Sequence, residues 1–360
     1  MRNVALLALT LLSVPSVWAA VLPMGVAVQT SPAYHGEWTA DTRNTWRGDD
    51  GEPRVQFNLR TSAGDSRWGF GVRLRDLAGL PTAAVANLAN DVQFSWTREA
   101  GTFRFNGSFD QGRGSGTYTF TPDQAFITNM AAAGYRNLST DDTVRLAVID
   151  VTVAHVRGLA QAGYPSLSLD DVVRTRIHKV TPEFIRDLAA VGYKGIDVDD
   201  LVRMGIHGAT PENIKALQAQ GIRGLSVEDV IKFRIHKVTP EFIRAMEQRG
   251  YKDIPAEDLV KMRIHKVTPE EVDQLKTQGF GGMDVDTLVK FRIHRVTPEF
   301  IKSMKDVGFV TVSEDQLVRL RIHKVDAQFV RDARADGFAL QTPGDAVDLA
   351  IHGPRWKRRG

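Results

Sequence analysis

The sequence predicts an α+β multidomain protein in which a small antiparallel β domain precedes an α-solenoid of about eight 29-residue helix-turn-helix repeats. Two observations predict the solenoid: histidines and glycines each recur every 29 residues, and the two series keep the same phase. A third predicts the β domain, because apolar and polar residues alternate in five stretches before the repeats begin. Self-similarity at a fixed period of this length is typical of repeat architectures.

Residues 1–19 have the features of a signal peptide. Arg2 precedes an apolar segment from Val4 to Leu12, and small residues stand at the −3 and −1 positions of a cleavage site after Ala19. The segment is shorter than the roughly 20 apolar residues of a membrane span. The sequence therefore predicts export, to the periplasm or the extracellular space, with residues 20–35 as an extended leader.

Residues 36–120 are predicted to form the β domain. Strict alternation of apolar and polar residues is typical of strands with one buried face. The predicted strands are Arg54–Thr61, Arg67–Leu74, Asp91–Arg98, Thr102–Phe109 and Gly116–Phe120. We expect a small meander sheet or half-barrel of five or six strands.

Two residue types mark each repeat. The histidines that recur every 29 residues are His178, His207, His236, His265, His294, His323 and His352. The glycines are Gly134, Gly163, Gly192, Gly221, Gly250, Gly279, Gly308 and Gly337. Two markers in register over eight periods exclude chance, so residues 121–352 are predicted to form the solenoid.

The first helix of a repeat is illustrated by the one that begins at Thr181. The Thr181 hydroxyl is expected to cap the helix, and Pro182 suits the first helical position, where an N–H has no partner. Val180 and Ile185 are placed to form a hydrophobic staple. Gly192 is expected to end the helix in the left-handed conformation.

The second helix repeats these features. Asp197 is its expected N-cap, and other repeats have Ser168, Ser226, Asp284 and Ser313 at the same position. Its expected buried face consists of Leu201, Val202, Met204 and Ile206. Helices of about 10 residues are marginal alone, so stacking between repeats is expected to stabilise them.

The two ends of the solenoid are expected to differ from its middle. The first helix, predicted from Thr121 to Gly134, is longer than its counterparts, as in a capping repeat. Pro343 and Gly344 are expected to weaken the last helix. Residues 353–360 form a basic tail.

The composition excludes several classes of site. The absence of cysteine excludes disulfides, thiolate zinc sites and a cysteine nucleophile. Removing Arg2 and the four cations of the last six residues from the 46 basic residues leaves 41, against 43 acidic ones. The folded part is thus close to neutral, whereas a nucleic-acid-binding domain is expected to carry a basic face. We expect no nucleic-acid partner, no metal and no cofactor.

The unit "LVRxRIHxVTPEFIxxLxxxGY" resembles the tandem repeats of exported bacterial proteins, which also occur appended to membrane metallopeptidases of the antirepressor and beta-lactam-sensor type. The region ending "GTFRFNGSFDQGRGSGTYTFTPDQ" is similar to the short β domain that often precedes them. The resemblance covers residues 36–352 and implies a module without a known activity. The peptidase motif His-Glu-x-x-His is absent, since no histidine is followed by glutamate. We expect a protein that is not an enzyme.

Cations near the carboxyl ends of the second helices form a candidate binding site, which we call the basic stripe. Its members are Arg176, Lys179, Arg234, Lys237, Arg263, Lys266, Arg292, Arg295, Arg321 and Lys324. The stripe would recognise an acidic protein face or a lipid head group. The favoured alternative is that the cations complement helix dipoles and pair with acidic caps of a neighbouring repeat, such as Asp229 or Asp258.

One repeat interrupts the stripe. Gly205 and Gly208 stand where other repeats have cations, and Asn213 replaces the usual phenylalanine. Sequence drift is the favoured explanation, and a local kink or a contact point is the alternative.

The repeated histidines are expected to shape the joint between helices by bonding the last carbonyls and packing on the next repeat. One shared metal ion is disfavoured, because ligands lie about 2 Å from an ion whereas stacked helices are about 8–10 Å apart. A pH-sensing ladder is the other alternative, since histidine titrates near neutral pH.

The tail residues Arg355, Trp356, Lys357, Arg358 and Arg359 are expected to be solvated, with weak contact to an anionic membrane as the alternative. The architecture favours a non-enzymatic exported protein that binds a protein partner through the solenoid surface. The alternatives are a regulatory or sensor partner of an envelope metallopeptidase or signalling system, and a structural protein that binds the envelope surface.

Overall fold

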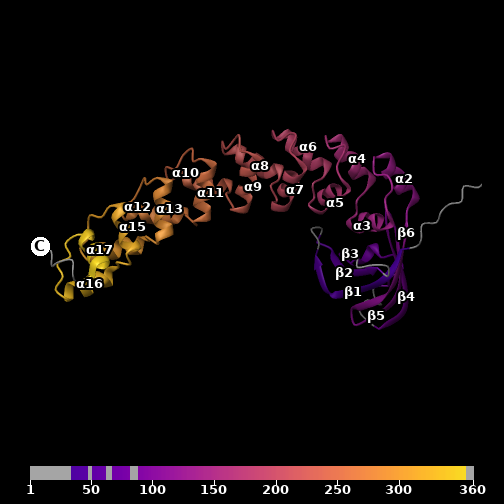
Figure 1. The fold of residues 1–360 in the computed structure, drawn as a ribbon, viewed down its shortest axis with the longest axis horizontal. Coiled ribbons are helices and arrows are strands. Elements are labelled where there is room, and N and C mark those ends of the chain that lie inside the picture. The colour runs from indigo at the N-terminus through magenta and orange to yellow at the C-terminus, as the bar shows by residue number, and fades with distance from the viewer. Residues whose placement is uncertain (1–33, 48–50, 62–66, 82–87, 354–360) are drawn as a thin grey trace, which may run out of the picture.

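The computed structural model describes residues 34–47, 51–61, 67–81 and 88–353, and it has the α+β layout that the sequence predicts (Figure 1). A six-stranded antiparallel sheet lies at one end, and an arched double row of helices extends from it. The predicted signal peptide lies outside the described residues, and so does the basic tail except for Gly353. So does the predicted leader, except for its last two residues, which begin the first strand.

The sheet contains one strand more than the five that alternation predicts. The strands are β1 (Tyr34–Arg47), β2 (Pro53–Thr61), β3 (Arg67–Arg73), β4 (Ala89–Arg98), β5 (Gly101–Asp110) and β6 (Arg113–Pro122). Their order is β3-β2-β1-β6-β5-β4, with antiparallel neighbours throughout. The sheet is therefore two three-stranded meanders joined through β1 and β6, rather than one continuous meander.

Aromatic side chains fill the inside of this curved sheet. The rings of Trp38 and Phe94 meet edge to face with centroids 5.4 Å apart, an arrangement that adds about 0.5–1.5 kcal/mol to area burial. A Cβ at Gly114 would lie 2.7 Å from the Trp38 ring, so this glycine makes room for the indole. Phe70 of β3 stacks on Trp96 of β4 at 4.9 Å, which shows that the outer strands curve toward each other.

The described helices form eight pairs. The first helices of the pairs are α2 (Gln124–Ala132), α4 (Val153–Gln161), α6 (Pro182–Ala190), α8 (Pro211–Ala219), α10 (Pro240–Glu247), α12 (Pro269–Thr277), α14 (Pro298–Asp306) and α16 (Ala327–Ala335). The second helices are α3 (Thr140–Ile149), α5 (Leu169–Ile177), α7 (Val198–His207), α9 (Val227–Ile235), α11 (Ala256–Ile264), α13 (Val285–His294), α15 (Glu314–Ile322) and α17 (Pro343–His352). Within each set the starting residues are 29 apart, which confirms the predicted repeat.

The predicted caps fix where the helices begin and end. The Thr181 hydroxyl accepts from the Phe184 amide at 3.1 Å at the start of α6. Such a cap stabilises a helix by about 1 kcal/mol. At the other end of α6, Gly192 has a φ of 104°, and the amide of Tyr193 donates to the carbonyl of Leu188 at 2.9 Å. This bond closes the helix as expected.

Both ends of the solenoid are more regular than the sequence suggests. The first helix, α2, has nine residues and a cap at Asp123, because residues 121 and 122 still belong to β6. The last helix, α17, has ten residues. Pro343 occupies its first position, and Thr342 forms a reciprocal capping box with Asp345. The expectations of a longer first helix and a weakened last helix were therefore wrong.

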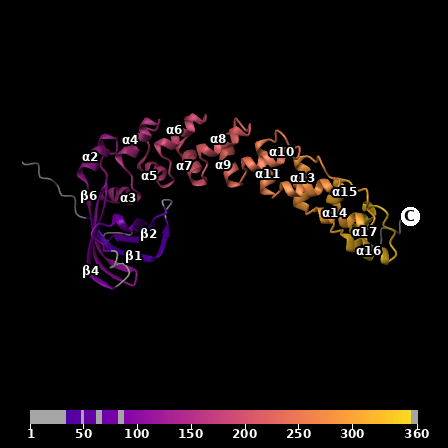
Figure 2. The same ribbon diagram turned by 180° about the vertical axis from the view of Figure 1, so that it is seen from behind.

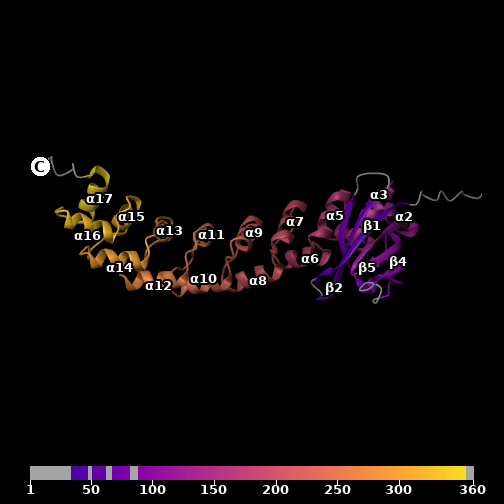
Figure 3. The same cartoon turned by 90° about the horizontal axis from the view of Figure 1, so that it is seen from below.

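The helices stack in two rows, one even-numbered and one odd-numbered. In the first half of the solenoid the odd-numbered row lies on the inner side of the arch, and α16 lies below α17 at the far end (Figures 1 and 2). The two rows therefore twist about each other along the molecule, and Figure 3 shows them from below.

The β domain and the solenoid share a core. Arg98 of β4 pairs with Asp150 after α3 at 3.4 Å, and Glu99 accepts from the amide of Val153 at 3.3 Å. One cluster of buried apolar residues runs from Trp38 through α3 to Ile231 in α9. A second cluster begins in α8 and α9 and continues to α17.

Candidate functional site

A tight joint follows each second helix and reverses the chain into the next repeat. After α9, His236 is the C-cap and Lys237 has a φ of 57°, in the left-handed region. Val238 is buried, and its amide donates to the carbonyl of Phe233 at 2.8 Å. Thr239 then caps α10. The end of the helices that carries these joints is called the joint edge below, and the opposite end, which carries the longer loops, the loop edge.

Of the five arginines that stand two residues before a repeated histidine, Arg234 is exposed and the other four bind the preceding repeat. The Nε atoms of Arg263, Arg292 and Arg321 donate, at 3.2 to 3.3 Å, to the backbone carbonyls of His236, His265 and His294. These carbonyls end the neighbouring second helix, where unpaired acceptors and the helix dipole both favour a cation. The backbone carbonyls of the repeated histidines thus accept hydrogen bonds from the arginines.

The same arginines also contact the first helix of their own repeat. The guanidinium of Arg263 lies over the ring of Phe242, 4.9 Å from its centroid. Where Glu271 replaces the phenylalanine, Arg292 forms an ion pair with it at 3.2 Å. Burial raises the pKa of Glu271, and the charge of Arg292 opposes this rise. The arginine position therefore serves the stacking of repeats.

The acidic caps pair with a different set of cations from the one expected. Pairs between neighbouring second helices join Arg145 to Asp170, Arg174 to Asp199, Arg203 to Glu228 and Lys261 to Asp286. Asp229 instead accepts from the amide and the hydroxyl of Ser226, at the start of its own helix. At the amino-terminal end of the stripe, Arg176 donates to the backbone carbonyl of Asp150 at 2.8 Å and to its carboxylate at 2.7 Å.

At the gap in the stripe, helix α7 lies close to the end of helix α5. A Cβ at Gly205 would stand 2.3 Å from the carbonyl oxygen of His178, so α7 lies too near the end of α5 to accept the arginine of other repeats. At the start of the next repeat, Asn213 forms a reciprocal capping box with Thr210. The two buried apolar clusters meet in this next repeat.

The remaining cations of the stripe occupy the left-handed position of the joint. They are Lys179, Lys237, Lys266, Arg295 and Lys324, which have φ values of 56° to 59° and exposed side chains. Gly208 and Gly353 occupy the same position with φ values of 63° and 64°. A residue with a Cβ costs about 1 kcal/mol there relative to glycine. Five repeats therefore keep a cation where the backbone favours glycine.

The side chains of the repeated histidines stand one repeat apart. His207 and His352 are exposed, and the other five are half-buried. In the part of the chain that the structure describes, no three histidine or carboxylate side chains are grouped so that they could hold a metal ion.

The isoleucine between the arginine and the histidine is exposed, which corrects the expectation for Ile206. Ile206 is 52% exposed, whereas Leu201 and Met204 of the same helix are buried. At 100° per residue Ile206 lies about 140° around the helix from Leu201, so the helical period carried this information. The equivalent residues, which with Ile206 we call the isoleucine row, are Ile177, Ile235, Ile264, Ile293, Ile322 and Ile351, each 46 to 53% exposed.

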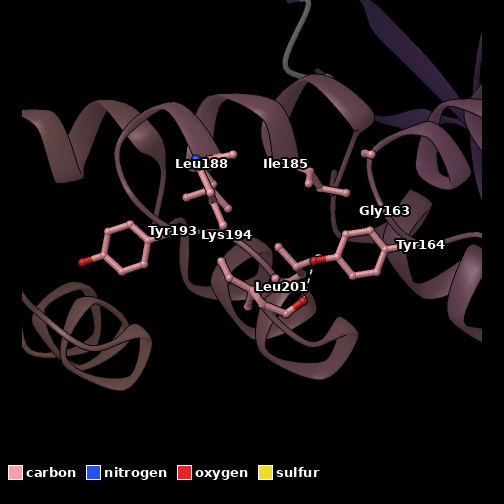
Figure 4. A pocket seen from close by; sticks show the side chains of 11 residues that line it. Gly163, Tyr164, Ile185, Leu188, Tyr193, Lys194 and Leu201 are labelled. Carbon is pink, nitrogen blue, oxygen red and sulfur yellow. Dashed lines mark hydrogen bonds between the residues drawn. The ribbon is translucent and has the colours of Figure 1, made fainter.

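The loop edge carries a series of shallow hollows. One of about 400 Å³ lies between the loops that follow α4 and α6, and its lining includes Tyr164, Leu188 and Lys194 (Figure 4). The Tyr164 hydroxyl donates to the carbonyl of Ile196 in the next loop. The same bond, from Tyr193 to the Leu225 carbonyl, measures 2.8 Å one repeat later. The tyrosines at this edge thus link neighbouring repeats.

A buried histidine escaped the sequence reasoning. His155 of α4 is only 8% exposed, and its Nε2 lies 3.1 Å from the hydroxyl of Thr175 in α5. Burial, with a smaller effect from the charge of Arg176, lowers the pKa of His155 to about 4. The repeat itself held the clue, since Phe126 and Phe184 stand at the same position in the flanking repeats.

No helix in the described part combines the length and the apolar character needed to cross a membrane. A scan against protein-family models matches none of them, and a search of curated proteins finds no sequence of significant similarity.

Proposed function

We propose that this protein is a non-enzymatic binding protein that captures a polypeptide partner along the joint edge of its solenoid. The observation that carries the proposal is the row of exposed cations at left-handed positions, Lys179, Lys237, Lys266, Arg295 and Lys324. A solenoid repeats its surface along its length and so offers an extended binding surface.

The arginine and lysine positions of the basic stripe have different roles. The arginines contact a carbonyl of the preceding repeat and the first helix of their own repeat, as Arg263 does with His236 and Phe242. Lys237, Lys266, Arg295 and Lys324 are exposed at positions whose backbone favours glycine. A charge kept at a cost to folding stability favours a role in recognition. Because the row is cationic, the partner is expected to present an acidic surface.

Export through the predicted signal peptide would bring this surface into the periplasm or the extracellular space, so the partner is sought in the cell envelope. The test is capture from envelope extract with the mature protein and a variant in which Lys237, Lys266, Arg295 and Lys324 are all changed to glycine. The matched control changes four exposed cations of the loop edge, Arg136, Lys194, Arg223 and Lys252, to glycine.

The expected result is a partner that the mature protein and the loop-edge variant retain and the joint-edge variant loses, with its elution promoted by salt. All three proteins should show the same helical content by circular dichroism. Equal retention by the joint-edge variant would overturn the proposal. Arginine variants are unsuitable here, because they would also break contacts between repeats.

A further inference from the structure

The isoleucine row places one exposed apolar side chain in seven successive joints. Among the described residues, nine large apolar side chains are exposed, and seven of them belong to this row. The other two are Leu88 before β4 and Val310 at the loop edge. Single exposed apolar residues need no explanation, but aligned ones mark interaction surfaces. This row is therefore a second feature of the joint edge, distinct from its charge.

Closure of the joint does not use these isoleucines. In the joint after α9, the buried Val238 anchors the turn through its bond to Phe233, while Ile235 stays 46% exposed. Two positions farther along, Lys237 is exposed as well. Five joints of the solenoid thus present an isoleucine and a cation side by side.

Of the five glutamates in the first turns at this edge, all but Glu270 bind backbone amides at the start of their own helices. Glu183, in the first turn of α6, has its pKa lowered chiefly by the backbone amide at the helix start, and Arg186 binds its carboxylate at 2.7 Å. Glu241 and Glu299 stand at the same position, and backbone amides also lower their pKa values. These carboxylates balance the positive ends of their own helices. The exposed cations Lys237, Lys266, Arg295 and Lys324 favour an acidic occupant.

The twist of the solenoid limits the shape of the occupant. The two rows of helices exchange their relative heights between α4 and α17 in Figures 1 and 2 but keep their order in Figure 3, so the arched array has a partial twist along its length. A flat membrane could contact only part of its joint edge, whereas an extended chain can follow it. Stacked helices are about 8–10 Å apart, and three residues of an extended polyproline-type segment span about 9 Å.

We infer that the joint edge binds an extended acidic segment of a partner protein, in which an apolar residue recurs at about every third position. The apolar side chains would pack on the isoleucine row, and the carboxylates between them would face the left-handed cations. This inference rests on the proposed function and adds the chemistry and the spacing of the partner.

The test is a fluorescence titration with a labelled peptide of seven Asp-Pro-Leu triplets. A protein variant changes Ile235, Ile264 and Ile293 to serine, and the control is Val310→Ser, which removes an apolar side chain that is 69% exposed at the loop edge. We expect the triple variant to bind about 100-fold more weakly, roughly fivefold for each half-exposed isoleucine, and the control to bind normally.

Altered peptides separate the contributions. Replacing leucine by serine in the peptide should weaken binding to the unaltered protein, and should weaken binding to the triple variant by a smaller factor, because that variant has already lost part of the same contacts. Replacing aspartate by lysine should abolish binding.

Four outcomes would overturn the inference. One is failure of the unaltered protein to bind the acidic peptide. A second is normal binding by the isoleucine variant when the four-glycine variant has lost both the peptide and the envelope partner, a result that leaves the proposed function standing. The third is binding to phosphatidylglycerol vesicles without peptide binding. The fourth is self-association that the isoleucine variant abolishes.

Discussion

The two ends of the second helices use their side chains in opposite ways. At the start of α7, Asp197 caps the helix and the Tyr193 hydroxyl bonds the next loop. At its end, Ile206 and His207 are exposed. The same contrast recurs through the array, although the arginines of the joint edge also serve stacking. The isoleucine and the left-handed cation of a joint stay exposed beside these contacts, which supports the proposal that they serve recognition.

The largest expected effect is on the free energy of unfolding, and it comes from a change near the start of α7, compared with a change at its end. Tyr193→Ala removes a half-buried aromatic ring and its hydrogen bond, and should lower the free energy of unfolding by about 2–3 kcal/mol. Ile206→Ser should lower it by less than about 1 kcal/mol, because the side chain is already half exposed. Urea unfolding followed by circular dichroism measures both. Similar losses would break the contrast between the edges.

The second effect separates the buried histidine from those of the joints. The pKa of His155 is about 4 in the folded protein and about 6.5 when unfolded, so the unfolded state binds the extra proton first as pH falls. The neutral ring costs nothing above pH 6.5, and stability is lost progressively between pH 6.5 and 4, by about 2–3 kcal/mol. Thermal unfolding across this range should show the loss.

The control for this effect is His155→Phe, which installs the residue that flanking repeats carry. It should remove most of the acid-dependent loss while leaving stability at pH 8 similar or higher. Parallel pH profiles for the two proteins would show that the joint histidines, or other groups, carry the pH dependence.

The third prediction compares the two kinds of cation in the basic stripe, the arginines that contact neighbouring helices and the exposed lysines. Arg263→Gln removes the ring contact with Phe242 and the bond to the His236 carbonyl, so the free energy of unfolding should fall by about 1–2 kcal/mol. Lys266→Gln, in the same joint, should change it by no more than about 0.5 kcal/mol. Equal effects in denaturant unfolding would contradict the division of the stripe into stacking arginines and exposed lysines.

The smallest effect has the opposite sign. Lys237→Gly relieves a left-handed backbone and should raise the free energy of unfolding by about 0.5–1 kcal/mol. Gly208→Lys, at the equivalent position, should lower it by a similar amount. Destabilisation by the first change would mean that the lysine side chain supports the fold.

The repeat was predictable because residues within each helix determine where that helix begins and ends. Thr181, Pro182 and Gly192 act within one helix, and the 29-residue period repeats them. By contrast, β1 was missed because its buried face includes the small residues Gly36 and Ala40, which weaken the alternation. Strand order was also beyond reach, since the pairing of β1 with β6 joins segments about 80 residues apart.

The candidate site was predicted only in part. The cations were identified from their period, but which of them touch the neighbouring repeat depends on stacking geometry that no single repeat encodes. Ile206 was predicted to be buried from its apolar character, although the helical period places it away from Leu201. His155 was not predicted, because it departs from the repeat pattern on which the predictions depended.

The most direct test of the central claim uses the two ends of one helix. A photo-crosslinking p-benzoylphenylalanine replaces either Ile264, at the joint edge, or Lys252, in the loop before α11, and each protein is irradiated in envelope extract. Binding along the joint edge predicts a covalent adduct with a partner polypeptide from position 264 and none from position 252. Adducts from position 252 alone would contradict the account and move the binding surface to the loop edge.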